Sequence, residues 1–344
     1  MELPTAIRDV RHLEELLSEP STVAIDAVRR VDGDLVVLGV TGKIGPTLAR
    51  MARRAMDAAG VSGRVIGVSR FSSPGQQHAL DLHGIETMRC DLLDEDAIAR
   101  LPDARNVIFM AGRKFGSTGD ESFTWAMNAH LPALICRRYR TSRIVAFSTG
   151  NVYGLTPSGQ GGSREEDAPA PVGEYAMSCL GRERLFEYFS RAHGTPVAIL
   201  RLNYAAEMRY GVLIDLAGRV FRREPIDLTM GYFNVIWQAD ANAMALAALA
   251  HTSSPPLIVN LAGPEELSVR ATCIELARLL GVDVSFTGRE TKDAVLSNGA
   301  RARALLGAPR VDAARLLAWT ADWIQRGGES LGKPTHFESR TGRF

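Results

Sequence analysis

Seven residues near the N-terminus have the types and spacing that binding a phosphate requires. They read Gly39-Val40-Thr41-Gly42-Lys43-Ile44-Gly45, with the glycines three apart. Glycine permits a tight turn and lets backbone N–H groups approach a pyrophosphate, which then lies at the positive end of a helix. A plain turn between a strand and a helix uses the same glycines. Because an apolar run, Leu35 to Leu38, precedes the motif and an amphipathic segment follows from Pro46, we predict a dinucleotide-binding turn.

The end of the next predicted strand indicates which dinucleotide binds. In NAD-binding versions of this turn, an Asp or Glu at that point holds the ribose hydroxyls. Here the strand ends at Ser69-Arg70 without an acid, and arginine presents a planar donor fork to phosphate oxygens. We therefore predict NADP(H) over NAD(H), with Arg70 as a solvated loop cation the simpler alternative. Asp91, after the following strand, is expected to reach the adenine edge or to cap the next helix.

An alternation of strands and helices positions these motifs. Apolar strands are expected at 35–38, 64–69, 84–91, 106–110, 143–148 and 195–202. Helices are expected between them at 46–59, 94–101, 122–138 and 175–193. This order predicts an α/β fold, a doubly wound parallel (Rossmann) sheet with helices on both faces.

The chain then divides into four parts that differ in pattern. We expect an N-terminal helical extension at 1–33, a dinucleotide-binding domain at 34–202 plus about 234–262, a smaller interleaved substrate lobe at 203–233 plus 263–330, and a loose polar tail at 331–344. A small-molecule substrate is expected between the two lobes, beyond the carboxyl ends of the strands.

Composition excludes several classes of function. The chain of 344 residues is 46% hydrophobic and 23% charged with a net charge of +1, so nothing favours nucleic acid or an anionic membrane as a partner. Four scattered cysteines and seven histidines show no metal-ligand or disulfide spacing. No apolar run is long enough to cross a bilayer, and the first residues are unlike a signal peptide. We expect a cytoplasmic protein without a metal.

From Leu35 to about Leu280 the chain resembles the extended short-chain dehydrogenase/reductase family, which includes the nucleotide-sugar epimerases and dehydratases. The resemblance rests on the three glycines, on Met110-Ala111-Gly112, on Ser148-Thr149-Gly150-Asn151-Val152-Tyr153-Gly154, and on Tyr175 at the start of a helix. It implies that Thr149 polarises the reacting oxygen of the substrate and that Tyr175 is the general acid/base.

One family position departs from the pattern. The usual signature is Tyr-x-x-x-Lys, which places both side chains on one helix face, but this chain has Cys179 at the lysine position. A phenol has a pKa of about 10, and lowering it to 7 takes roughly 4 kcal/mol. A neighbouring ammonium helps to supply this, and a thiol does not. We expect Cys179 to be a small buried hydrophobe.

Another cation is then needed near Tyr175. Arg113 and Lys114 follow the strand at 106–110 and the pair Ala111-Gly112, and the sugar-epimerase branch also resembles this segment, with a lysine two residues past the glycine. We predict that Lys114, or failing that Arg113, lowers the pKa of Tyr175. The alternative is that both are solvated loop cations.

Further residues complete the predicted site. The predicted cofactor contacts are Gly39, Thr41, Gly42, Lys43, Ile44, Gly45, Ser69, Arg70, Asp91, Leu92, Ala111, Gly112, Arg113 and Tyr175. The candidate substrate contacts are Asn151, Arg201, Asn203, Arg209, Asn234 and Gln238, each of which suits a structural hydrogen bond equally well. Asn128 matches a family asparagine that fixes the backbone near the tyrosine.

Together these features predict hydride transfer between a nicotinamide and a secondary alcohol or ketone of a sugar or nucleotide-sugar-like substrate, in an epimerase or a net oxidoreductase. Dehydration is less expected, because the dehydratase branch follows its threonine with an Asp-Glu pair and here Gly150-Asn151 follow. The alternative is a dinucleotide-binding regulatory protein with little or no turnover. The helices at 122–138 and 175–193 resemble those that pair in dimers of the family, which implies a homodimer. Their apolar residues suit a place in the intramolecular core equally well.

Overall fold

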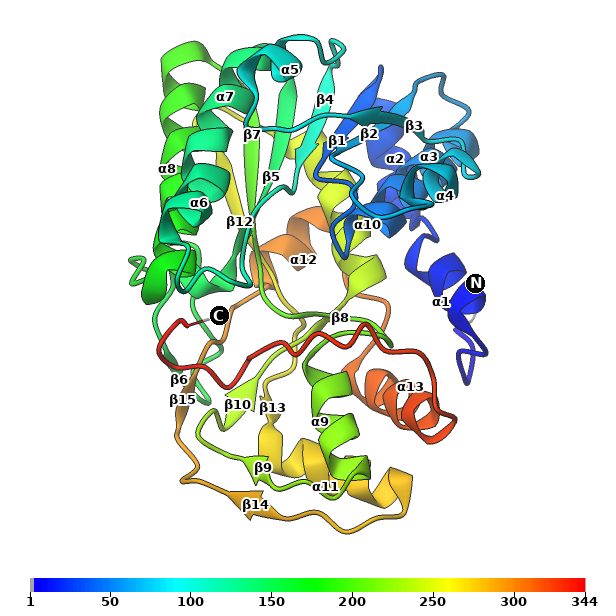
Figure 1. Cartoon of the computed structure of the whole chain (residues 1–344), viewed down its shortest axis with the longest axis vertical. Coiled ribbons are helices and arrows are strands. Elements are labelled where there is room, and N and C mark those ends of the chain that lie inside the picture. The colour runs from blue at the N-terminus through cyan, green and yellow to red at the C-terminus, as the bar shows by residue number, and fades with distance from the viewer. Residues whose placement is uncertain (1–2, 344) are drawn as a thin grey trace.

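A seven-stranded sheet forms the centre of the computed structural model, which describes residues 3–343 (Figure 1). All of its strands are parallel, in the order β3-β2-β1-β4-β5-β7-β12. The strands are β1 (Leu35–Leu38), β2 (Val65–Ser69), β3 (Glu86–Arg89), β4 (Asn106–Phe109), β5 (Arg143–Thr149), β7 (Val197–Leu202) and β12 (Leu257–Leu261). The order reverses between β1 and β4, so the predicted doubly wound parallel sheet is confirmed, with its switch point beside the glycine turn.

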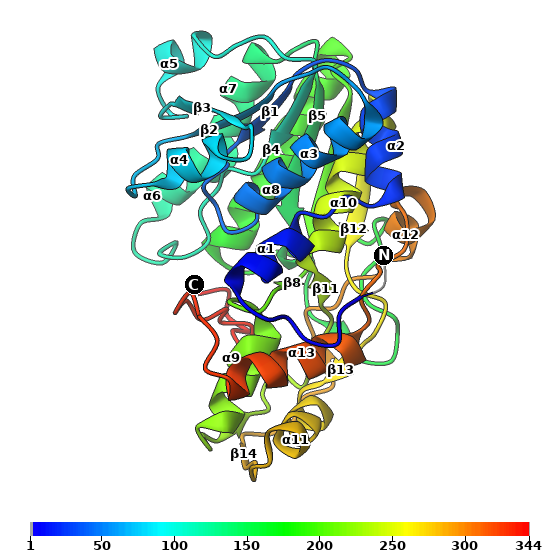
Figure 2. The same ribbon diagram turned by 90° about the vertical axis from the view of Figure 1, so that its right-hand side faces the viewer.

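Helices cover both faces of this sheet. One face carries α1 (Val10–Leu17), α2 (Thr22–Arg30), α3 (Gly45–Ala59) and α10 (Gln238–Ala248), which pack on one another (Figure 2). The other carries α5 (Glu95–Ala99), α6 (Glu121–Trp125), α7 (Leu131–Arg138) and α8 (Gly173–His193). A further helix, α4 (Gln76–Asp81), packs against β3. Along β1, Leu35 and Val37 join one hydrophobic core, and Val36 and Leu38 join the other, which explains why this strand is apolar throughout.

The helix expected at 122–138 is interrupted. A π-helical turn at Ala126–His130 separates α6 from α7. Pro132 has no N–H to donate to the carbonyl of Asn128, four residues earlier, so the α-helical pattern cannot run through this point. The wider turn directs the fully buried Asn128 toward α8.

A smaller lobe lies beyond the carboxyl ends of the strands, below the sheet in Figure 1. Its helices are α9 (Val212–Phe221), α11 (Val269–Leu280) and α13 (Ala313–Gln325). Short strand pairs connect its segments: β8 (Ala205–Ala206) with β11 (Ile236–Trp237), β9 (Ile226–Asp227) with β14 (Phe286–Thr287), β10 (Tyr232–Phe233) with β13 (Leu267–Ser268), and β6 (Thr156–Pro157) with β15 (Asp293–Ala294). One more helix, α12 (Ala300–Leu306), packs on β12 and α10 of the sheet domain.

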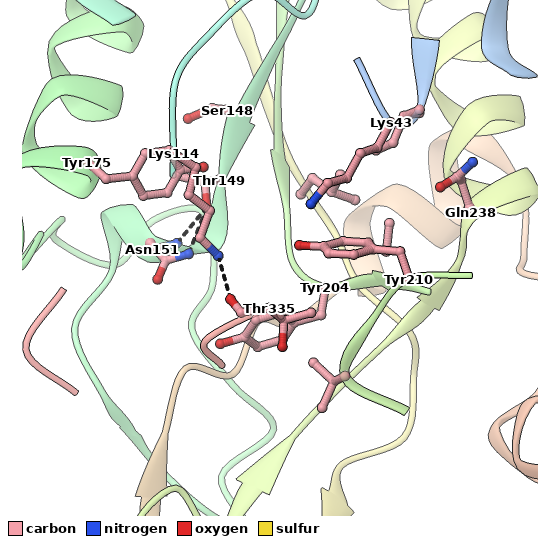
Figure 3. Close-up of a pocket in the computed structure, with 14 residues that line it drawn as sticks. Lys43, Lys114, Ser148, Thr149, Asn151, Tyr175, Tyr204, Tyr210, Gln238 and Thr335 are labelled. Atoms are coloured by element: carbon pink, nitrogen blue, oxygen red, sulfur yellow. Dashed lines mark hydrogen bonds between the residues drawn. The ribbon is translucent and has the colours of Figure 1, made fainter. Parts of the chain in front are cut away.

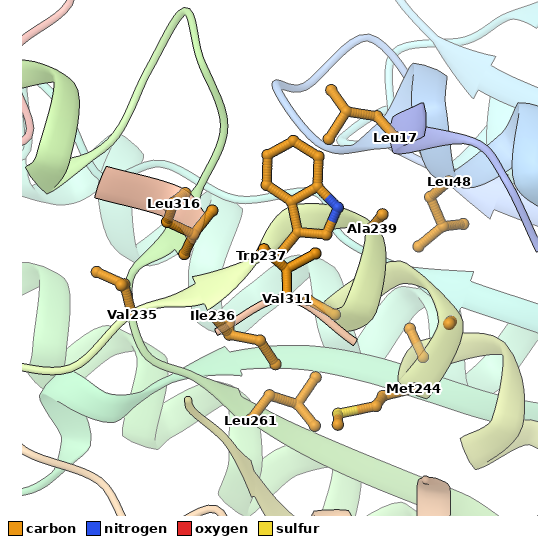
Figure 4. Packing of buried hydrophobic residues seen from close by; sticks show 14 of the residues in the cluster. Leu17, Leu48, Val235, Ile236, Trp237, Ala239, Met244, Leu261, Val311 and Leu316 are labelled. Carbon is orange, nitrogen blue, oxygen red and sulfur yellow. The ribbon is translucent and has the colours of Figure 1, made fainter. Parts of the chain in front are cut away.

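One apolar core joins the two lobes and the N-terminal helices. Trp237, fully buried at the start of α10, packs on Trp319 of α13 with 5.5 Å between ring centres. Leu17 of α1 and Leu48 of α3 belong to the same core (Figure 4). The lobes that flank the predicted site are therefore fixed to each other by packing.

The C-terminal segment is not loose, contrary to the sequence-based expectation. It crosses between the lobes as an extended segment (red in Figure 1). Thr335 and Phe337 are each only 3% exposed, and Arg340 forms an ion pair with Asp293 at 2.8 Å. Thr335 donates to the carboxylate of Asp215 in α9 through its backbone N–H and its hydroxyl. Asp215 and Asp293 both lie far from this segment in the sequence, so composition does not reveal that the tail is packed.

Candidate active site

The glycine turn is built for a close approach of its backbone to other groups. Gly39 has φ of +87°, and a Cβ there would lie 2.8 Å from the Cα of Ala111. A Cβ at Gly45 would overlap the carbonyl oxygen of Val40. Neither position accepts a side chain without a shift of the backbone, so glycine is needed at both ends of the turn that connects β1 to the N-terminus of α3. A groove of about 300 Å³ runs from this turn to Gly112 and Tyr175. A groove of this size can receive part of a dinucleotide, with a pyrophosphate at the N-terminus of the helix.

The ends of β2 and β3 carry the residues that were expected to select the dinucleotide. Ser69 lies beside the turn, with its hydroxyl 2.6 Å from that of Thr41. Arg70 is exposed. Asp91 is also exposed, and one of its carboxylate oxygens accepts the N–H of Leu93 at 3.1 Å. Asp91 therefore closes the turn before α5 but does not cap this helix, because the N-cap is Asp94. Its contact with the adenine edge stays a prediction.

Thr149 and Tyr175 meet in one cavity at the carboxyl edge of the sheet, as Figure 3 shows. Thr149 ends β5 and Tyr175 lies in the first turn of α8. The cavity measures about 210 Å³. Its walls include Lys43, Lys114, Ser148, Thr149, Asn151, Tyr175, Tyr204, Tyr210, Gln238 and Thr335. Both polar groups therefore face a space large enough for part of a small substrate.

The tyrosine is not acidic by itself. Burial raises the pKa of Tyr175 well above its usual value, and a thiolate at Cys179 would raise it further. A hydrogen bond with Thr149 and the charge of Arg182 oppose this increase in the pKa. Cys179 is 1% exposed and packs with Val152 and Tyr153, and burial raises the pKa of its thiol. The site therefore needs positive charge from other residues.

The two cations after β4 have different surroundings. The ammonium of Lys114 lies 5.8 Å from the ring centre of Tyr175 and donates to the carbonyl of Thr335 at 3.4 Å (Figure 3). Burial lowers the pKa of Lys114 to about 8. The Arg113 guanidinium instead forms an ion pair with Asp120 at 2.6 Å, within its own loop. Of the two candidates, Lys114 is the one whose charge is in the cavity.

Lys43 extends from the glycine turn to the junction of the groove and the cavity. Its ammonium lies 3.3 Å from the ring centre of Tyr210 and 4.4 Å from that of Phe115. Burial and the charges of Lys114 and Lys333 lower the pKa of Lys43 to about 7. An anionic group placed here would restore the lysine's proton, because opposite charge favours the ionised form.

Arg182 is a residue that sequence reasoning missed. It lines the groove with Gly112 and Tyr175 and is 6% exposed. Asn128 connects Arg182 to the loop after β4. The amide oxygen of Asn128 accepts from the Arg182 guanidinium and from the backbone N–H of Arg113, each at 2.8 Å. The same amide donates to Ser178 of α8 at 3.0 Å. These contacts fix Asn128 between the helix of Tyr175 and the loop of Lys114, where we expected it to stabilise the backbone.

Comparison with known proteins agrees with this geometry. Residues 35–206, half of the chain, match the model of the NAD dependent epimerase/dehydratase family. The chain belongs to this family. A curated relative, the dTDP-glucose 4,6-dehydratase of Streptomyces niveus, is 27% identical over 177 residues. That match covers 48% of this chain and 52% of the relative, so the chain matches about half of the relative's length.

Solved structures of epimerases share the whole fold. The UDP-glucuronic acid 4-epimerase of Bacillus cereus is 19% identical with a TM-score of 0.70, over 85% of this chain and 99% of that one. The UDP-glucose 4-epimerase of Thermotoga maritima is 18% identical with a TM-score of 0.69, over 86% and 99%. An epimerase of Methanothermobacter thermautotrophicus is 19% identical with a TM-score of 0.70, over 90% of this chain and 97% of that one. At these identities the likeness shows the fold.

In this family member, two of the candidate substrate contacts lie in the cavity. Asn151 donates to the Thr149 hydroxyl oxygen through its backbone N–H at 3.1 Å and its amide at 3.0 Å. Gln238 lines the opposite wall and donates to Thr47 at 3.0 Å. Both remain candidates for contact with a substrate.

The other four candidates lie outside this cavity and have structural partners. Asn203 donates to the amide oxygen of Asn234 at 2.6 Å, and Asn234 in turn holds the carbonyl of Ser297. These two asparagines connect β7, the second lobe and the segment before α12, behind the cavity wall. Arg209 pairs with Glu207 and Glu14. Arg201 pairs with Glu183 beneath β5. From the sequence, these polar residues suited a substrate contact and a structural hydrogen bond equally well. In the fold, all four have structural partners.

Tyr204, Tyr210 and Thr335 line the cavity although sequence reasoning did not select them. Tyr204 lies two residues after the end of β7, so its place just past the carboxyl end of a strand was a signal that could have found it. Tyr210 and Thr335 gave no such signal. Among residues 3–343 there is also no cluster of metal-ligating side chains, and no helix there has the length and apolarity needed to span a membrane.

Proposed function

We propose that this family member catalyses reversible hydride transfer between a nicotinamide dinucleotide and a secondary alcohol or ketone of a sugar or nucleotide-sugar-like substrate, as an epimerase or a net oxidoreductase. One observation carries the proposal. Thr149 and Tyr175 share a hydrogen bond and one cavity, and that cavity adjoins the groove from the glycine turn.

The hydrogen bonds of Thr149 suit it to hold a reacting oxygen. Its hydroxyl oxygen accepts two N–H groups of Asn151, so its own O–H is directed to another acceptor. In the oxidative direction Tyr175 takes the proton of the substrate hydroxyl, and Thr149 donates to the same oxygen. A bound, oxidised nicotinamide would accept the hydride from the carbon that bears this hydroxyl. Return of the hydride to the opposite face of the same carbon, with the proton returned to its oxygen, would give the epimer. If the hydride stays on the nicotinamide and the ketone is released, the result is net oxidation.

Dehydration is the less favoured reaction in this proposal. Elimination of water needs an acid and a base beside the sugar in addition to the tyrosine. No Asp or Glu is among the residues that line the cavity, and Asn151 stands where the dehydratase branch has a carboxylate.

The test of the function is turnover on a panel of sugars, sugar acids and nucleotide sugars. Nicotinamide absorbance detects net oxidation, and chromatography of the products detects epimers, which leave the absorbance unchanged. Product formation that depends on the dinucleotide supports the proposal. Tight dinucleotide binding without any product across the panel would favour the regulatory alternative.

We propose NADP(H) as the dinucleotide, because β2 ends in Ser69 and the exposed Arg70 without an acid. Replacing Arg70 with alanine is then expected to raise the Kd for NADP⁺ by roughly 10-fold, which corresponds to one charge-assisted hydrogen bond, and to leave the Kd for NAD⁺ unchanged. Fluorescence titration of both dinucleotides measures this. An equal effect on both, or tighter NAD⁺ binding by the unaltered protein, would reverse the assignment.

Lys114 is proposed to supply positive charge to Tyr175, and its own pKa of about 8 makes this role visible in pH profiles. Above that pH the ammonium loses its proton, so kcat/KM in the oxidative direction is expected to fall. Lys114→Met should have lower activity and no descending limb near this pH, and Lys114→Arg should move the limb to higher pH. An unmoved limb in both variants contradicts the role.

A homodimer is the proposed assembly. Helices α6 and α8 present Trp125, Met177 and Tyr188 to solvent, with 39%, 44% and 63% of each residue exposed. Aromatic and methionine side chains are enriched in interfaces. Light scattering should give twice the mass of the 37.3 kDa chain.

A further inference from the structure

The helix that carries Tyr175 holds a second candidate for the missing positive charge. Arg182 lies seven residues after Tyr175 and three after Cys179 on α8. About seven residues make two helical turns, so all three lie on one side of the helix. Helical side chains lean toward the helix N-terminus, so a long side chain at 182 covers the turn that holds Cys179. The family's lysine would occupy that region.

The guanidinium of Arg182 is buried among neutral oxygens. It donates to the carbonyl of Phe147 at 2.7 Å, and to the amide oxygen and carbonyl of Asn128 at 2.8 and 3.3 Å. The adjacent Glu183 pairs with Arg201, and no ion pair involves Arg182 in the described part of the chain. A buried charge with only neutral partners is usually destabilising. Because no carboxylate pairs with it among the described residues, the positive charge of Arg182 can act on neighbouring groups.

Two features of the sequence make room for this guanidinium. Pro132 leaves the carbonyl of Asn128 without its helical donor, and Arg182 supplies one. A Cβ at Gly112 would overlap the guanidinium, so the glycine leaves the space that Arg182 occupies. The arginine is therefore held by the π-helical turn on one side and by the Phe147 carbonyl of β5 on the other.

We propose that Arg182 is a positioning residue that gives Tyr175 the positive charge that the family's lysine gives, across the space left by Cys179. The proposal rests on the proposed role of Tyr175 as acid/base. The charge of Arg182 lowers the pKa of both Tyr175 and Cys179. A guanidinium keeps its proton throughout the working pH range, whereas Lys114 loses its proton near pH 8. The two cations thus differ in pH dependence.

The test measures the ionisation of the tyrosine itself and needs no substrate. A fluorinated tyrosine, whose phenol is intrinsically more acidic, is incorporated at position 175, and its ¹⁹F resonance is followed against pH in the protein saturated with NADP⁺. Arg182→Met is expected to raise the pKa of this phenol by roughly 1 pH unit or more. Adding Cys179→Lys to Arg182→Met is expected to lower it again, because the lysine is restored to its family position.

Controls separate charge from structure. Arg184→Met removes an exposed arginine of the same helix and should leave the titration unchanged. If Arg182→Met does not fold, Arg182→Lys and Arg182→Gln replace it, and only the glutamine variant should raise the pKa. Equal titration of the charged and uncharged variants would overturn the proposal. A shifted titration in a protein without turnover would instead uphold the role of Arg182 and reject the proposed reaction.

Discussion

Replacing Tyr175 with phenylalanine is expected to reduce kcat by roughly 100- to 10,000-fold, the range that a general acid or base contributes. The change removes one hydroxyl and keeps the ring. It deletes the only group in the proposal that takes the substrate's proton. Steady-state kinetics on a substrate found in the panel measures the effect in both directions.

The same variant should keep its fold and its cofactor. The aromatic ring still packs in the wall beside Cys179, so the melting temperature should remain close to that of the parent. The Kd for the dinucleotide should rise by no more than roughly 10-fold, because at most one hydrogen bond to the cofactor is lost. Thr149→Val is the companion variant, with a smaller loss because a hydrogen bond to the oxygen is removed while the proton acceptor remains. A Tyr175→Phe protein that retains a tenth or more of the parent's kcat would require a different acid/base.

The largest effect on stability is expected at Glu183, below the site. Its carboxylate accepts from Arg201 through Nε at 3.0 Å and through Nη2 at 2.7 Å, and it also accepts the hydroxyl of Ser148. Both charged side chains are buried, with 3% of Arg201 and 2% of Glu183 exposed. Glu183→Gln leaves the guanidinium buried without its counter-charge. We expect the free energy of unfolding to fall by about 3–5 kcal/mol, measured by urea denaturation.

A matched surface variant and a double variant test the reason for this loss. Glu187→Gln, on the same helix, breaks exposed ion pairs with Arg184 and Arg191 and should remove less than about 1 kcal/mol. Glu183→Gln combined with Arg201→Met should recover part of the stability, because no buried charge is then unpaired. A single Glu183→Gln variant as stable as the surface control would show that the buried pair contributes little.

Several parts of the site follow from local pattern. The glycine turn between Leu38 and Pro46 was found because only glycine fits where β1 meets α3. Thr149 and Tyr175 were paired by resemblance, and the fold brings them together because β5 ends at the edge of the sheet where α8 begins. The choice of Lys114 over Arg113 was left open by the sequence. It depends on Asp120, which holds Arg113 in its own loop.

The sequence by itself determined the doubly wound sheet and the glycine turn, because these depend on periodicity and on backbone geometry within short segments. It indicated Thr149 and Tyr175 only through the resemblance to a known family. Only the tertiary structure decided which cations surround the tyrosine and what closes the cavity. Lys114 meets Thr335 across 221 residues of sequence, and Arg182 reaches Asn128 across 54. Such contacts depend on where long side chains meet after packing, and no local pattern encodes that.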